Sequence, residues 1–248
     1  RVERGDAPIL APREAHAYLA AVREVTCEVL EAADLDGPDP LLRDGFVFDM
    51  VAQHEAQHAE TVLQAFQLLP PGAYVPPARP AAPPVAPATA GEWVEVPGGA
   101  FAMGAGADGF AYDCERPCHE RRVDPFLMAR DPVTNGAHLA FIEDGGYARP
   151  ELWTAEGWRW RRREGAEAPL YWRRDGEGGW LERRFDELAP VDPARPLCHV
   201  SAHEADAHAR WAAARLPSEA EWERAASGAP HADGGPDLGQ VAFGTLPV

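Results

Sequence analysis

The feature that most constrains this chain is a proline-rich stretch near its first third. Residues 70–87 read PPGAYVPPARPAAPPVAP and hold eight prolines in eighteen positions. Proline fixes φ and lacks a backbone donor, so such a run forms neither helix nor sheet and adopts an extended polyproline conformation. The chain is therefore expected to form two domains, at 1–69 and 91–248, joined by a linker at 70–90.

The segment before the linker has the periodicity of helices. Residues 12–33 begin with Pro12 and place Ala15, Leu19, Val22, Val25 and Val29 at helical spacing. A breaker cluster (DLDGPDP) follows, and a second apolar stripe predicts a helix over 41–69. Two helices cannot bury two such stripes by themselves, so we expect a helical bundle whose other members lie upstream of Arg1.

After the linker the pattern changes to short strands and helices. Residues 93–96 alternate as a strand does, Pro97-Gly98-Gly99 predicts a turn, and residues 101–104 resume the strand. Helices are expected near 134–144 and 201–214, with a loop-rich stretch over 145–196 that holds five of the eight tryptophans. The fold class is thus α+β, with a helical first domain and an irregular second domain.

Charge and hydropathy exclude several classes of partner. The chain has 40 acidic and 23 basic residues, a net charge of −17, which disfavours binding to nucleic acid or to anionic membranes. No apolar run reaches the ~18 residues that a membrane span requires. Four irregularly spaced cysteines form no evident disulfide framework, and no targeting segment is visible. We therefore expect a cytoplasmic protein.

The candidate chemical site is a histidine pair within the second predicted helix. His54 and His58 are four residues apart, so both imidazoles lie on one helix face and can share a metal ion. The string HEAQH also fits the zinc-protease pattern H-E-x-x-H. That site requires a third ligand downstream, but no acidic residue lies between Glu60 and Glu92, which disfavours the protease. The remaining ligand comes from His16 or from a residue upstream of Arg1.

The chain resembles a known enzyme family at this helix and in its second half. FVFDMVAQHEAQHAETVLQAFQL is similar to the metal-binding helix of the DinB-like domain in ergothioneine-biosynthesis sulfoxide synthases. VEVPGGAFAMG and RLPSEAEWE resemble the formylglycine-generating-enzyme/sulfatase-modifying-factor domain, which has a C-type-lectin-like fold. The resemblance implies a DinB-like helical domain, partly missing upstream, followed by a formylglycine-generating-enzyme-like domain whose C-terminal part is missing.

The resemblance also implies a reaction and a set of site residues. In that family three histidines hold iron(II), and O₂ is used to join a thiol to the imidazole carbon of Nα-trimethylhistidine (hercynine) with oxidation of the sulfur. Two of these histidines match His54 and His58, and the third is expected before Arg1. Gln57 matches a residue that contacts hercynine. Arg1 and Arg4 match arginines of members that use γ-glutamylcysteine, and arginine pairs well with carboxylates. No catalytic acid is assigned, because the matching segment lies beyond Val248.

Other interpretations remain open. Cysteine in place of γ-glutamylcysteine as the thiol, or an ovothiol- or selenoneine-type reaction, would need the same architecture. Cys114 and Cys118, with His119, could suggest a second metal site, but the spacing lacks a partner pair. The resemblance also brings in sulfatase-type cysteine oxidation, which is disfavoured because nothing here matches the paired-cysteine copper site that those enzymes have late in the domain. A lectin-like protein that binds a ligand without catalysis is a third possibility. The sequence does not indicate an oligomeric state.

Overall fold

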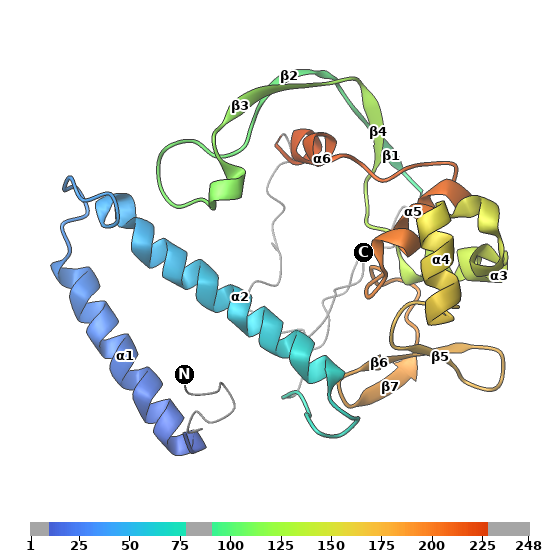
Figure 1. The fold of residues 1–248 in the computed structure, drawn as a ribbon, viewed down its shortest axis with the longest axis horizontal. Coiled ribbons are helices and arrows are strands. Elements are labelled where there is room, and N and C mark those ends of the chain that lie inside the picture. Colours follow the sequence, from blue (N-terminus) through green and yellow to red (C-terminus); the bar gives the residue numbers. More distant parts are fainter. Residues whose placement is uncertain (1–9, 78–90, 228–248) are drawn as a thin grey trace. The chain divides into compact units, whose positions relative to one another are not determined.

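The computed structural model describes residues 10–77 and 91–227, which fall into two compact units. The first unit comprises residues 1–60 and 104–118, and the second comprises residues 61–103 and 119–248. The units are described separately below, with the elements labelled as in Figure 1. Within the described ranges, no helix is both long enough and apolar enough to cross a membrane.

The first helix, α1, spans Pro12–Ala32, as its periodicity predicts. Proline at the first turn costs no hydrogen bond, and the Glu14 carboxylate accepts a hydrogen bond from the Ala11 N–H at 3.0 Å. The apolar side chains of α1 are largely exposed, with Leu19 at 61% and Val25 at 58%. The described residues thus do not cover this stripe, and the DinB-like bundle stays a prediction.

The second helix, α2, spans Phe46–Leu68 and starts later than predicted. A 3₁₀ turn, η2, occupies Arg43–Gly45 in place of the first helical turn. Asp44 and Gly45 both have positive φ, at 56° and 74°, which an α-helix cannot include. The prediction that the helix begins at residue 41 was therefore wrong. The apolar pattern continues through residues 41–45, but the backbone there is not α-helical.

A loop at residues 104–118 completes the first unit and contains the short 3₁₀ helix η3, Asp113–Glu115. The Phe110 ring contacts Phe46 edge-on at 5.4 Å between centroids and Tyr112 at 5.0 Å. Gly104 closes the loop with φ of 89°, and a Cβ there would lie 2.6 Å from the Glu115 carbonyl oxygen. Only glycine fits this position.

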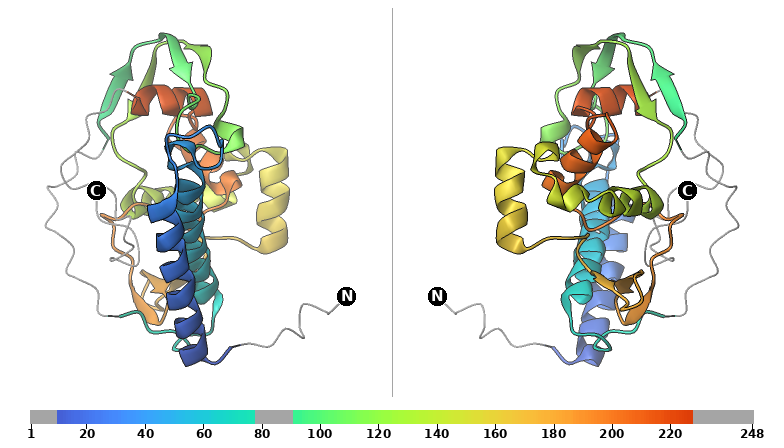
Figure 2. Two further views of the ribbon diagram at one scale, coloured as in Figure 1. Left: turned by 90° about the vertical axis from the view of Figure 1, so that its left-hand side faces the viewer. Right: turned by 90° about the vertical axis from the view of Figure 1, so that its right-hand side faces the viewer.

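The second unit begins with a long, bent, two-stranded antiparallel ribbon (Figures 1 and 2). A Cβ on Gly98 would lie 2.6 Å from the backbone nitrogen of Pro125, so the chain is closely packed at the bend. The turn predicted at Pro97-Gly98-Gly99 is only this bend, because strand pairing resumes at Gly99. The register pairs Val96 with Phe126 and Met103 with His119. The strands are β1 (Trp93–Val96) with β4 (Phe126–Ala129), and β2 (Gly99–Met103) with β3 (His119–Val123).

Four helices of the second unit begin at a serine or threonine cap, and three of them lie outside the stretch 145–196. Thr134, Ser201 and Ser218 each accept a hydrogen bond from a backbone N–H in the first helical turn, which satisfies one of the orphan donors there. The two predicted helices are present near their expected positions, and a third was not anticipated. They are α3 (Asn135–Glu143), α5 (Ala202–Trp211) and α6 (Glu219–Ala226).

The stretch 145–196 is more regular than predicted. It contains a helix and a three-stranded antiparallel sheet in the order β5-β6-β7. The helix AEGWRWRRRE has no apolar period, and its ends are set by Thr154 and by Gly165 in the left-handed conformation. Strands of three to five residues likewise give little periodic signal. The elements are η4 (Gly146–Ala148), η5 (Pro150–Leu152), α4 (Ala155–Glu164), β5 (Trp172–Arg174), β6 (Trp180–Arg184) and β7 (Glu187–Pro190).

The hydrophobic core of the second unit is aromatic and lies among α3, η4, η5 and α5. Phe141 is fully buried, and Tyr147 and Trp153 are 4% and 5% exposed. The Trp153 indole N–H donates to the Gly146 carbonyl at 3.0 Å, so its polar atom is satisfied within the core. Of the tryptophans in the predicted loop region, Trp153 thus lies in this core, and Trp158 and Trp160 pack against it.

Candidate functional site

The histidine pair lies midway along α2, on the part of the helix that belongs to the first unit. His54 and His58 occupy adjacent turns of one face, and their ring centroids are 4.4 Å apart with the planes at 88°. Both side chains are exposed, so an ion and its other ligands could reach the two rings. Neutral imidazoles at this spacing can occupy two neighbouring positions of one coordination sphere.

The structure does not bring a third ligand to this pair within its described ranges. Among residues 10–77 and 91–227, no group of three or more His, Cys, Asp or Glu side chains could hold a metal ion. His16 is exposed on α1 and joins no such group. Gln57 directly precedes His58 on α2 and is also exposed. Arg1 and Arg4, the candidate carboxylate-binding residues, lie outside the described residues.

Within the described part of the chain, no cysteine joins a group of side chains that could hold a metal ion. Cys114 and Cys118 are free and exposed, and Cys198 is free and partly buried. Burial, with a smaller contribution from the Glu182 carboxylate, raises the pKa of the Cys198 thiol above its ordinary value. A thiol with a raised pKa is a poor nucleophile and a poor metal ligand.

A buried polar network in the second unit was not found by sequence reasoning. The Tyr147 hydroxyl donates to the Glu204 carboxylate at 2.6 Å and lies 3.2 Å from His138 Nε2. His138 Nδ1 in turn lies 3.2 Å from His208 Nδ1. The four residues come from α3, η4 and α5. They are brought together only by the packing of these elements, so no local spacing in the sequence indicates the network.

The network has one self-consistent direction. Because Tyr147 donates to Glu204, its oxygen must accept from His138, which therefore carries its proton on Nε2. His138 Nδ1 is then an acceptor, and His208 donates to it from Nδ1. Burial, reinforced by the neighbouring His208, lowers the pKa of His138 to about 3. Burial followed by Glu204 raises the pKa of Tyr147, so both groups stay neutral.

This network has a structural role. His138 is 0% exposed and Glu204 is 3% exposed, so a substrate cannot reach either side chain. Each polar atom in this series of hydrogen bonds has a partner. The bonds therefore avoid the penalty of burying unsatisfied polar groups and favour one packing arrangement. Catalytic chemistry must therefore be sought outside this core.

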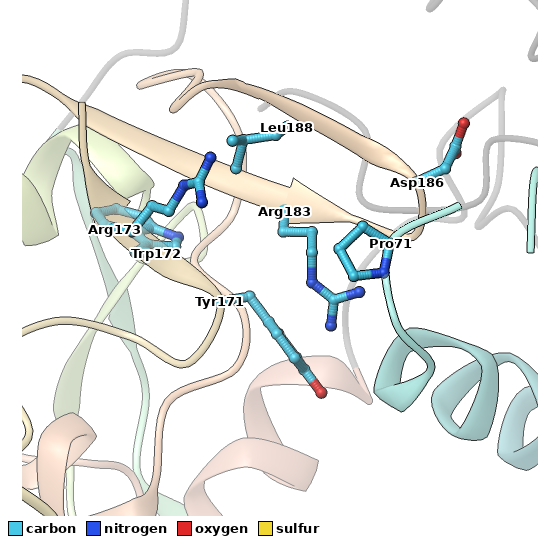
Figure 3. A pocket seen from close by; sticks show the side chains of 7 residues that line it. All are labelled: Pro71, Tyr171, Trp172, Arg173, Arg183, Asp186 and Leu188. Atoms are coloured by element: carbon cyan, nitrogen blue, oxygen red, sulfur yellow. The ribbon is translucent and has the colours of Figure 1, made fainter. Parts of the chain in front are cut away.

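A cavity of about 340 Å³ opens beside the three-stranded sheet of the second unit (Figure 3). Its walls include Tyr171, Arg183 and Leu188, with Pro71 from the segment that follows α2. The Arg183 guanidinium lies 4.9 Å from the centre of the Tyr171 ring. The cavity is therefore bordered by the place where the end of α2 meets the sheet.

Comparison with known proteins identifies the family of the second half. The sulfatase-modifying factor enzyme 1-like domain matches residues 79–238. The chain belongs to this family, which confirms the expected formylglycine-generating-enzyme-like domain and agrees with the mixed helices and strands of the second unit.

Among individual relatives, hercynine oxygenases match over most of the chain. That of Mycolicibacterium smegmatis is 39% identical over 233 residues, covering 91% of this chain and 50% of the relative. That of Mycobacterium tuberculosis is 42% identical over 227 residues, covering 91% and 51%. The formylglycine-generating enzyme of Streptomyces coelicolor is 35% identical over 165 residues, covering 54% of this chain and 46% of the relative. The chain spans about half the length of the hercynine oxygenases it matches.

Proposed function

We propose that this chain is part of an iron(II)- and O₂-dependent sulfoxide synthase that acts on hercynine. The observation that carries the proposal is the His54–His58 pair on α2, within a chain similar to hercynine oxygenases over 91% of its length. The formylglycine-generating enzyme of Streptomyces coelicolor matches only 54% of the chain, which favours the synthase over sulfatase-type cysteine oxidation.

The proposed reaction joins the thiol of γ-glutamylcysteine or cysteine to the imidazole carbon of hercynine. One C–S bond forms and one C–H and one S–H bond break, while the sulfur is oxidised to a sulfoxide. O₂ accepts four electrons: one oxygen atom enters the sulfoxide, and the other leaves as water with the two released hydrogens. The reaction therefore needs no further reductant.

The residues of this chain have distinct proposed roles. His54 and His58 supply two imidazole ligands, and the remaining protein ligand lies outside the described residues. Bound iron(II) would supply open positions for the thiolate and O₂ and would favour deprotonation of the thiol. Gln57 contacts hercynine, and Arg1 and Arg4 bind the carboxylates of γ-glutamylcysteine through paired N–H donors. Helices α1 and α2 then form part of a DinB-like domain.

The test is an anaerobic iron(II) titration of the full-length protein, followed by exposure to O₂ with hercynine and each thiol. The wild type should bind one iron per chain and form the sulfoxide. His54→Ala and His58→Ala should each abolish tight iron binding and product formation but leave the protein folded, because both side chains are exposed. His16→Ala, on α1, tests the other candidate ligand, and it should bind iron as the wild type does if the remaining ligand lies outside the described residues. Full iron occupancy in either α2 variant would refute the proposal.

A further inference from the structure

The C-terminal end of α2 is held by its one buried residue. Gln67 is 6% exposed, and the rest of the helix is exposed or half-buried. Its side-chain amide donates from Nε2 to the Arg183 carbonyl at 2.8 Å and accepts at Oε1 from the Phe185 N–H at 2.6 Å. Both halves of the amide are thus used on the end of β6 and the residue that follows it, 116 and 118 residues further along the chain.

The Arg183 side chain also donates hydrogen bonds to carbonyls at the helix end. Its Nη2 donates to the Gln67 carbonyl, and its Nη1 donates to the carbonyls of Leu69 and Phe185 at 3.1 and 3.2 Å. The last carbonyls of a helix have no partner within the helix, and a cation there also complements the helix dipole. The guanidinium lies over the Tyr171 ring, and Figure 3 shows the two side chains next to each other. We call these contacts the Gln67–Arg183 clamp.

The backbone around the clamp is strained. Phe185 and Tyr171 have φ of 55° and 75°, a region in which residues other than glycine are uncommon. Both are tied to clamp residues, since the Phe185 N–H donates to Gln67 and the Tyr171 carbonyl accepts from the Arg183 N–H at 3.0 Å. Such conformations persist only where surrounding contacts enforce them, and they concentrate where position matters.

We propose that Gln67 and Arg183 are positioning residues of the iron site, acting through helix α2. The helix is continuous from Phe46 to Leu68, and Gln67 follows His58 by nine residues, about 14 Å along the axis. Its residues from Thr61 onward belong to the second unit, as does the whole clamp. The clamp therefore anchors the ligand-bearing helix in the formylglycine-generating-enzyme-like part of the chain. This inference rests on the proposed function.

Substitutions at Gln67 and Arg183 test the clamp without changing the rest of the helix. Arg183→Met removes its donors but keeps an aliphatic stem against Tyr171, and Gln67→Leu removes the amide at similar volume. Arg183→Lys keeps the charge but carries its donors on one nitrogen, so it loses the planar fork whose two terminal nitrogens reach different carbonyls. The matched control is Arg174→Met on β5, because Arg174 also lies over an aromatic ring, 4.1 Å from the centre of Trp180, and donates to a carbonyl without touching α2.

The first measurement is hydrogen exchange in the metal-free protein. Amides of the last turn of α2 and the amide of Phe185 should exchange at least tenfold faster in Arg183→Met and Gln67→Leu, and at the wild-type rate in Arg174→Met. Unchanged exchange in both clamp variants would overturn the proposal, because the contacts would then not hold the helix end.

The second measurement separates positioning from folding. In the full-length protein, Arg183→Met should keep iron affinity within about twofold, lower kcat at least tenfold and consume more O₂ per sulfoxide formed, with Arg183→Lys intermediate. Wild-type kcat and coupling, or equal losses of iron affinity and kcat, would overturn the inference. A wild-type protein that binds no iron would refute the proposed function and this inference with it, whereas the first two outcomes would overturn only the inference.

Discussion

Substitution of Gly146 by alanine should measure how tightly the aromatic core of the second unit is packed. A Cβ at this position would lie 2.5 Å from Cζ of Phe141, and two further carbons of that ring would be closer still. Real Cβ atoms do not approach a ring carbon so closely, so either the ring or the η4 backbone must move by about 1 Å.

The Phe141 ring has little room to move. It is fully buried, and the rings of His138, Tyr147 and Trp211 surround it at centroid distances of 5.1, 5.5 and 5.8 Å. Overpacking of this kind costs about 1–3 kcal/mol, and because the overlap is severe we expect Gly146→Ala to cost about 3 kcal/mol. For a protein of this size, a loss of that order lowers the melting temperature by about 6–12 °C.

The assay is thermal unfolding followed by near-ultraviolet circular dichroism, which reports the packing of these aromatic rings. Gly145→Ala is the adjacent control, because a Cβ there meets no atom within 4 Å and only the φ of 75° opposes it. Its expected cost is about 1–2 kcal/mol. Phe141→Leu should partly rescue Gly146→Ala by making room. The reasoning fails if Gly146→Ala melts within 1 °C of the wild type, or if it is less damaging than Gly145→Ala.

Two further predictions concern the buried network. Because the pKa of His138 is lowered to about 3 in the folded state, the unfolded chain binds the extra proton first. Stability is therefore full above pH ~6.5 and falls as the pH drops towards 3, by at most about 5 kcal/mol from this group. Urea denaturation between pH 7 and 4 should show this slope, and His138→Gln should flatten it. Tyr147→Phe leaves His138 Nε2–H without an acceptor and should cost about 1–3 kcal/mol at pH 7, measured by the same assay; no loss would contradict the assigned tautomer.

Sequence patterns located the elements whose signal is local. Pro12 and the apolar spacing marked α1, and Thr134 marks the start of α3. The histidine pair was visible because both residues lie four apart on one helix. The family motifs identified the domain that residues 79–238 match.

Features that depend on the meeting of distant segments were not predictable in this way. His138 and His208 are seventy residues apart, and neither has a neighbour in the sequence that indicates burial. In the sequence, Gln67 is an ordinary polar residue near a helix end, and its role becomes visible only from its contact with Arg183. The helix α4 was missed because its sequence is mostly charged and has no apolar stripe. Its ends are defined by the capping residues Thr154 and Gly165.

The clamp at the end of α2 also determines where relatives of this chain can be recombined. A crossover in the proline-rich stretch would pair Gln67 and Leu69 from one parent with Arg183 from the other, and mismatched partners would leave helix-end carbonyls unsatisfied. A crossover before Thr61 would transfer both sides of the contact together. The segment that should be exchanged as one piece therefore begins inside α2, upstream of the prolines that mark the boundary in the sequence.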